Sequence, residues 1–241
     1  MQQIEYDRVL LKFSGEALAG SKRFGIDNDV LDYLTDEILS LKEFDLDIGI
    51  VIGGGNIFRG IDITTEGVNR IRADYMGMLG TVINGIAIQD YLIRKGAKAR
   101  VLSAIRMDEV ADPMIIRNVQ EYFDDDYIVI FTGGTGRPFF STDSGAALRA
   151  SEINADLFIK ATKVDGVYTA DPVKNKDAKL YKNLDYDTAI QNKLGVMDTT
   201  AFSLCQDNNI PIMVYNMMNS GDLKNSLISD NVGTLITKGG Q

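Results

Sequence analysis

The sequence predicts an α/β fold with a largely parallel β-sheet that is covered by helices on both faces. Strand-like apolar runs alternate with amphipathic helical runs along all 241 residues. The hydrophobic content of 45% is enough for a substantial core in one large domain or two small lobes. No low-complexity stretch, linker or short repeat interrupts the alternation. We therefore expect one continuous α/β architecture.

The first half of the chain predicts four strands, at 8–13, 47–52, 99–105 and 127–132. Residues 28–44 have the pattern of an amphipathic helix, with Asp27 or Asn28 as its cap. Residues 67–95 predict a long helix, because apolar side chains recur at steps of three and four. Asp112-Pro113 is a signal for the start of a third helix.

The second half continues the alternation. Residues 143–153 predict a helix and residues 156–161 a strand. The segments that follow predict a helix at 197–209, a strand at 210–216, a short helix at 221–229 and a strand at 233–237. In open sheets of this kind, ligands bind beyond the carboxyl ends of the strands. The loops after the strands are therefore the candidate site.

Composition limits the function classes. A net charge of −9 argues against general binding to nucleic acid or to an anionic membrane. The start of the chain contains no apolar signal segment, and no apolar run approaches the roughly 20 residues that span a bilayer. We therefore expect a cytoplasmic protein.

The absence of histidine excludes Ser-His-Asp and Cys-His catalysis and histidine-ligated zinc or iron. Cys205 is the single cysteine, so no internal disulfide or cysteine metal cluster can form. Any metal is expected to be a hard cation such as Mg²⁺, held by oxygen together with a phosphate ligand.

Four predicted strands lead into loops that suit phosphate groups. Glycine lets backbone N–H groups approach an anion, and a following helix N-terminus adds positive potential. One glycine-rich loop is more often a simple turn, but several at one edge of a sheet favour phosphate binding. The loops read KFSGEAL (12–18), GGGNIFRG (53–60), GGTGRPFFSTDS (133–144) and KATKVDGVYTADP (160–172).

The common nucleotide-binding motifs are absent from these loops. Phe58 stands where the dinucleotide motif G-x-G-x-x-G needs its last glycine, which argues against a Rossmann oxidoreductase. Ser21 stands where a Walker loop needs lysine. The sequence therefore favours a nucleotide site assembled from several loops.

Taken together, the motifs resemble those of the bacterial uridylate (UMP) kinases of the amino acid kinase superfamily. The resemblance runs essentially end to end. It is carried by LLKFSGEAL, FGID, VIGGGNIFRG, ADYMGMLGTVING, PFFSTDSGAALRA, IKATKVDGVYTADP, VMDTTAF and YNMMNSG, in family order and spacing. It implies a three-layer αβα sandwich with a mostly parallel central sheet.

The resemblance also implies a reaction: reversible transfer of the γ-phosphoryl group of ATP to UMP with Mg²⁺, in pyrimidine nucleotide synthesis. The family is typically a homohexamer that GTP activates and UTP inhibits. We expect a single domain over 1–241, with an acceptor-binding part at roughly 1–155. The ATP-binding part is expected at roughly 156–241 together with the first glycine loop.

The resemblance assigns catalytic roles to Lys12, Arg59, Asp143 and Lys160. Lys160 lies in a predicted buried strand, where an unpaired lysine is costly, so an anionic partner is expected there in any case. Arg59 could instead form a surface pair with an acidic neighbour, and Asp143 could simply cap a helix. The implied ATP-binding residues are Lys12, Phe13, Ser14, Gly15, Gly55, Arg59, Thr162, Tyr168 and Asp171. The loop 160–172, which contains Thr162, Tyr168 and Asp171, also has the turn signals of a tight hairpin.

The resemblance assigns UMP binding to Gly54, to Asp74 in the long helix, and to the segment after the fourth strand, which is Thr135, Gly136, Arg137, Pro138, Phe139, Phe140, Ser141 and Thr142. Arg137 departs from the family pattern, which has asparagine or a similar small polar residue there. If its side chain faces the site, acceptor selectivity is in question.

Two other functions remain open at this stage. A different kinase of the superfamily would phosphorylate a carboxylate or a carbamate, but PFFSTDS together with Asp74 suits UMP better. A non-catalytic sensor of uridine nucleotides would not need to retain Lys12, Arg59, Asp143 and Lys160.

Overall fold

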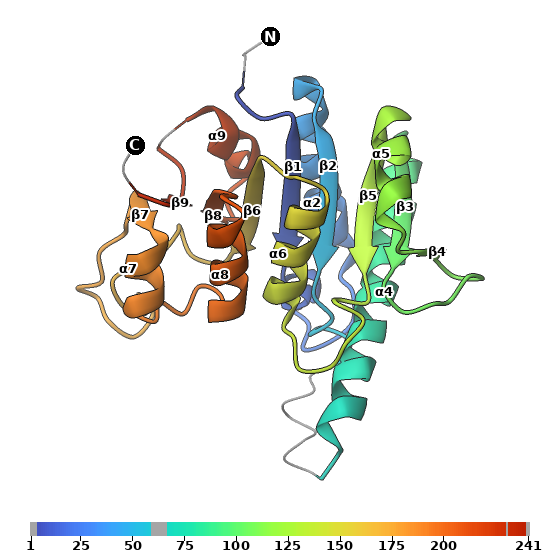
Figure 1. The fold of residues 1–241 in the computed structure, drawn as a ribbon, viewed down its shortest axis with the longest axis horizontal. Helices are drawn as coiled ribbons and strands as arrows, with labels where there is room; N and C mark the ends of the chain where they lie inside the picture. Colours follow the sequence, from blue (N-terminus) through green and yellow to red (C-terminus); the bar gives the residue numbers. More distant parts are fainter. Residues whose placement is uncertain (1–3, 59–66, 230, 240–241) are drawn as a thin grey trace.

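One nine-stranded sheet forms the centre of the computed structural model, which describes residues 4–58, 67–229 and 231–239 (Figure 1). The strand order is β4-β3-β5-β2-β1-β6-β8-β9-β7. The strands are β1 (Arg8–Phe13), β2 (Asp47–Ile52), β3 (Lys98–Ser103), β4 (Asp112–Pro113), β5 (Tyr127–Thr132), β6 (Leu157–Thr162), β7 (Asn183–Asp185), β8 (Ile212–Asn216) and β9 (Thr234–Thr237).

Neighbouring strands are parallel except for β8 and β9, which are antiparallel. The prediction of a mostly parallel sheet is therefore confirmed. In the register of β1 and β6, Lys12 lies directly beside Lys160. The two lysines consequently leave the sheet on the same face.

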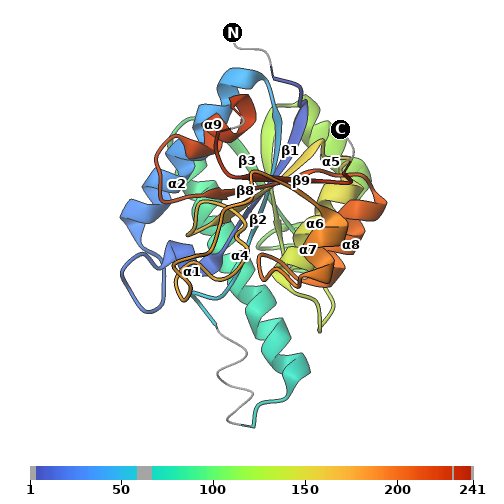
Figure 2. The same cartoon turned by 90° about the vertical axis from the view of Figure 1, so that its left-hand side faces the viewer.

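Helices cover both faces of the sheet, which confirms the three-layer αβα arrangement (Figure 2). On one side lie α1 (Gly15–Leu18), α2 (Asn28–Ser40), the 3₁₀ helix η1 (Leu41–Phe44), α4 (Arg70–Arg94) and α9 (Asp222–Ile228). On the other side lie α5 (Ile116–Asp124), α6 (Thr142–Glu152), α7 (Tyr186–Gln191) and α8 (Thr199–Asp207).

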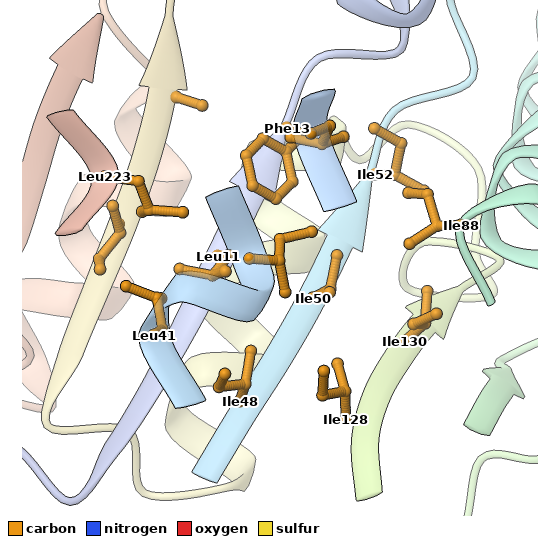
Figure 3. Packing of buried hydrophobic residues seen from close by; sticks show 14 of the residues in the cluster. Leu11, Phe13, Leu41, Ile48, Ile50, Ile52, Ile88, Ile128, Ile130 and Leu223 are labelled. Atoms are coloured by element: carbon orange, nitrogen blue, oxygen red, sulfur yellow. The ribbon is translucent and has the colours of Figure 1, made fainter. Parts of the chain in front are cut away.

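Alternation along the strands fills two hydrophobic cores. Leu11 of β1 and Ile50 of β2 pack with Ile88 of α4 in the core shown in Figure 3. Leu10 points to the opposite core, beneath α6 and α8. Because side chains alternate, Lys12 belongs to the same face as Leu10. The cation of Lys12 therefore lies near the carboxyl end of a buried strand, beside the N-terminus of α6.

Two predicted boundaries differ in the structure. Asp112-Pro113 does not start a helix: it forms β4 beside β3, and α5 begins at Ile116. Proline lacks the N–H group that a central strand would donate, and β4 lies at the edge of the sheet, where that group is not needed. The predicted helix 28–44 ends as α-helix at Ser40 and continues as η1. Its N-cap is Asp27, which accepts from Asp29 N.

α4 is long and apolar enough to cross a membrane by length and composition, and it is the one such helix among the residues that the structure describes. Its buried residues, including Val82 and Ile88, pack toward the sheet. The core helix of a folded domain passes the same test, so this is weak evidence for a membrane span.

Candidate active site

The carboxyl ends of β1, β2, β5 and β6 bring the four predicted loops to one edge of the sheet (Figure 1). The end of β1 contacts the glycine loop after β2, because Gly53 N donates to Phe13 O at 3.0 Å. Phe13 itself is buried in the core, so only its backbone faces the loops. The prediction that these loops share one edge is confirmed.

The glycines permit contacts that no side chain could make. A Cβ on Gly15 would lie 2.3 Å from Gly53 O, and a Cβ on Gly54 would lie 2.4 Å from Gly77 O of α4. Real Cβ atoms do not approach backbone oxygens this closely. The glycine loop is therefore pressed against both α1 and α4.

A buried amide pair, which the sequence analysis did not identify, holds the glycine loop in place. Asn84 Nδ2 donates to Gly53 O at 2.7 Å and to Asn56 Oδ1 at 2.6 Å. Asn56 Nδ2 donates back to Asn84 Oδ1 at 3.0 Å and to Gly25 O at 2.9 Å. Both residues are almost completely buried, and their amide hydrogens are all paired. The signal in the sequence that could have identified Asn84 is its position, because it is a polar residue among the apolar side chains of the predicted helix 67–95.

Two buried lysines share one carboxylate at the centre of the edge. Lys12 Nζ lies 2.7 Å from Asp143 Oδ1, and Lys160 Nζ donates to Asp143 Oδ2. The side chains of both lysines are at most 10% exposed. Asp143 lies in the first turn of α6 but does not cap it, since Ser141 accepts from Ser144 N. The alternative of Asp143 as an N-cap is therefore wrong.

The electrostatics of this cluster are dominated by burial and by the two like charges. Burial alone would raise the pKa of Asp143, but Lys12 and Lys160 outweigh it and the pKa lies below its ordinary value. Burial, followed by the charge of Lys12, lowers the pKa of Lys160 to about 8, against the opposing effect of Asp143. The cluster carries an excess positive charge that an anionic ligand would stabilise.

A first cavity of about 300 Å³ opens beside the glycine loop. Its lining includes most of the residues for which the resemblance implies UMP binding, namely Gly54, Asp74, Thr135, Phe140, Ser141 and Thr142. Gly55, Phe58, Gly134 and further residues of α4, among them Arg70, complete the lining. The residues come from the loop after β2, from α4 and from the loop between β5 and α6, so the fold assembles this cavity from distant parts of the chain.

Asp74 ties the loop after β5 to α4. Its carboxylate accepts from Phe139 N at 2.8 Å and from Arg70 Nε at 2.8 Å. Phe139 adopts a positive φ of 74°, which is rare for a bulky residue, and the bond to Asp74 helps to hold it there. Gly136, Arg137, Pro138 and Phe139 are not among the lining residues of the first cavity. Arg137 is exposed, so its side chain leaves that cavity unobstructed.

A second cavity of about 500 Å³ lies beyond the end of β6. Its lining includes Thr162, Tyr168 and Asp171, the residues of this loop for which the resemblance implies ATP binding. The loop is wider than the predicted tight hairpin, because the chain pairs only at Tyr168 and Leu180. The opposite wall is formed by residues 192–196, which the sequence analysis missed since no periodic pattern marks them.

Arg59 lies outside the residues that the structure describes. Within the described part of the chain, no group of three or more carboxylate or cysteine side chains could hold a metal ion.

Comparison with known proteins agrees with this geometry. The model of the amino acid kinase family matches residues 7–216. The chain is 53% identical over 217 residues to the uridylate kinase of Aliarcobacter butzleri, covering 90% of this chain and 92% of that protein. It is 50% identical over 233 residues to the uridylate kinase of Yersinia enterocolitica, covering 97% and 94%.

Solved structures give the same result. The UMP kinase from Bacillus anthracis superposes with a TM-score of 0.94 at 40% identity, covering 98% of this chain and 97% of that one. The UMP kinase from Ureaplasma parvum superposes with a TM-score of 0.91 at 34% identity, covering 99% and 100%. The chain belongs to the amino acid kinase family and, within it, to the uridylate kinases.

Proposed function

We propose that this chain is a UMP kinase, a phosphotransferase that moves the γ-phosphoryl group of ATP to UMP and yields ADP and UDP in pyrimidine nucleotide synthesis. The observation that carries the proposal is the pair of buried lysines on Asp143, together with the fact that near neighbours in the chain of Asp143 and Lys160 line the two cavities. Thr142, which precedes Asp143, lines the first cavity, and Thr162, two residues after Lys160, lines the second. A phosphoryl group that moves between the cavities would pass these cations.

The chemistry requires only what the cluster supplies. The attacking group is a phosphate oxygen of UMP, which is already anionic at neutral pH, so no general base is needed. Catalysis then consists of alignment and of neutralising charge on the transferring group. Lys12 and Lys160 supply positive charge, and Asp143 holds them in position. The Mg²⁺ ion enters with ATP as part of the substrate.

The ATP side of the reaction is assigned to the loops after β1, β2 and β6. Backbone groups of Phe13, Ser14, Gly15 and Gly55 approach the phosphates, and Arg59 adds a forked donor. The adenosine end occupies the second cavity. There it contacts Thr162, Tyr168 and Asp171.

The UMP side is assigned to the first cavity. Gly54 and Thr142 face the acceptor phosphate, and Asp74 binds the ribose. Backbone groups of residues 135–141 read the uracil edge. The acceptor-binding part, roughly 1–155, and the ATP-binding part, roughly 156–241 with the first glycine loop, form a single domain in this proposal.

The finer properties that the resemblance implies are part of the same proposal: a cytoplasmic homohexamer, activated by GTP and inhibited by UTP. Support for self-association comes from α4, which exposes a row of large apolar side chains, including Met76, Leu79 and Ile83, each more than 40% accessible. Contiguous exposed apolar patches commonly mark subunit interfaces. Light scattering of the purified protein tests the assembly.

The experiment that tests the function is ADP release from Mg-ATP by the purified protein. Acceptors are UMP, CMP, dUMP, aspartate, glutamate and carbamate in parallel, each with and without GTP. Lys12→Ala is compared with Lys224→Ala. Lys224 lies on α9, away from the site, and pairs with Glu43 of η1.

We expect turnover with UMP, loss of turnover in Lys12→Ala, and unchanged turnover in Lys224→Ala. Turnover with a carboxylate or carbamate and none with UMP would move the protein to another branch of the superfamily. Tight UTP binding without any turnover would identify a sensor.

A further inference from the structure

One carboxylate, Asp198, joins the N-termini of the two helices that flank the catalytic cluster. It caps α8 by accepting from Ala201 N at 3.0 Å through Oδ1. The same oxygen accepts from Ser144 Oγ at 2.9 Å, and Oδ2 accepts from Ser141 Oγ. A cap needs only the first of these bonds. The other two reach into a different helix, far away in the sequence.

The two serines bracket Asp143 in the first turn of α6. Ser141 is the N-cap of α6 and accepts from Ser144 N at 3.0 Å. Asp198 therefore fixes the rotamer of the cap and the position of the turn that presents Asp143 to Lys12 and Lys160. A displacement of about 1 Å at such a point can reduce a rate by roughly a hundredfold.

Asp198 also connects the walls of the two cavities. Ser141 lines the first cavity. Residues 192–196, which end shortly before Asp198, line the second. In addition, the negative charge of Asp198 favours the protonated form of Lys160, since it acts to raise the pKa of that lysine. The other charged groups that act on Lys160 are Lys12 of β1 and Asp143 of α6.

We propose that Asp198 is a positioning residue for phosphoryl transfer, which holds the first turn of α6 so that Asp143 and the lysines keep their reactive geometry. The inference rests on the proposed function. The competing explanation is that Asp198 only caps α8. The two explanations differ in what a substitution does to kcat when the cap is preserved.

Asp185 provides a matched control. It caps the neighbouring helix α7 and accepts from Thr188 N and Thr188 Oγ1, both at 2.7 Å, so its bonds stay within its own helix. Serine is also a good N-cap. Asp198→Ser and Asp185→Ser therefore both retain a cap, but only the first loses the bonds to α6. Ser144→Ala removes one of those bonds and leaves the α8 cap intact.

We expect Asp198→Ser to lower kcat between tenfold and a hundredfold with KM for UMP and ATP changed less than about threefold. Asp185→Ser leaves kcat unchanged. Asp198→Ser loses more thermal stability than Asp185→Ser, because it also gives up the bonds to Ser141 and the buried Ser144. Ser144→Ala also lowers kcat, but by a smaller factor than Asp198→Ser does. Equal kcat in Asp198→Ser and Asp185→Ser, at full folding, would overturn the proposal.

A second readout does not depend on turnover. The titration of Lys160 is followed by NMR in protein labelled with ¹³C and ¹⁵N lysine, with Lys160→Arg identifying the signal. We expect its pKa to fall in Asp198→Asn, which keeps an oxygen for the α8 cap, and to stay unchanged in Asp185→Asn. If the wild-type protein does not phosphorylate UMP, the proposed function fails, while this titration still decides whether Asp198 acts on the cluster. An unchanged pKa in Asp198→Asn would reject that action.

Discussion

Replacing Asp143 with asparagine removes the carboxylate that pairs with both buried lysines while preserving the shape of the side chain. Lys12 and Lys160 then remain in the protein with two positive charges and no counter-ion from α6. Breaking a buried ion pair by removing one partner costs about 3–5 kcal/mol. We therefore expect Asp143→Asn to lower the free energy of unfolding by about this amount at pH 7.

Part of this loss in the free energy of unfolding depends on pH, because Lys160 becomes neutral when it releases its proton. Its pKa in the folded protein is about 8, against an ordinary value of 10.5. The folded state therefore releases this proton at a lower pH than the unfolded state does. Wild-type stability consequently rises with pH between these two values. In the variant the pKa is lower still and the rise begins earlier. The difference between variant and wild type consequently shrinks by about 1.4 kcal/mol from pH 7 to pH 9.

The assay is urea unfolding followed by circular dichroism at pH 7, 8 and 9, since the chain contains no tryptophan. Asp29→Asn is the control, because Asp29 occupies the same position in the first turn of α2 and is exposed. Its loss is limited to the helix-dipole interaction, about 0.3–1 kcal/mol. A penalty for Asp143→Asn no larger than that of the control, or one that does not change with pH, would refute the reasoning.

Three further predictions follow from the site. Gly54→Ala places a Cβ against Gly77 O and should lower the free energy of unfolding by about 1–3 kcal/mol in the same urea assay; a neutral result would mean that the glycine loop is free to move away from α4. Asp74→Asn should raise KM for UMP at least tenfold, equivalent to about 1.4 kcal/mol, and an unchanged KM would remove Asp74 from the acceptor site. In pH-rate profiles, kcat/KM for ATP should fall as pH rises through about 8, where Lys160 loses its charge, and Lys160→Arg should abolish this fall.

Much of the sheet could be predicted from local pattern. Buried parallel strands such as 8–13 and 47–52 are nearly continuous apolar runs, and their bounds match β1 and β2. The short elements β4, β7 and α7 could not be predicted in this way. They hold few residues, and their position is decided by contacts with distant strands. The prediction that Asp112-Pro113 starts a helix was wrong for this reason, because pairing with β3 overrides the local helix signal.

In the candidate site, too, some residues could be predicted from local pattern and others depend on contacts between distant parts of the chain. Lys160 could be suspected from its place in a buried strand, because a lysine there requires an anion. The family resemblance implies that Asp143 helps to organise the catalytic lysines, but no local pattern shows it. The pairing of Asp143 with both lysines follows from the register of β1 and β6 and from the position of α6. The pair Asn56 and Asn84 and the carboxylate of Asp198 act through residues far away in sequence, so no local motif marks them.

The central claim is that the lysine cluster transfers a phosphoryl group between the two cavities. The most direct measurement is a single turnover with ATP labelled in its γ-phosphate, in the presence of Mg²⁺ and UMP, followed by separation of the products. We expect the label to appear in the β-phosphate of UDP, and we expect Lys12→Ala to leave it in ATP while the protein stays folded. Label released as inorganic phosphate, or transferred equally well by Lys12→Ala, would contradict the account.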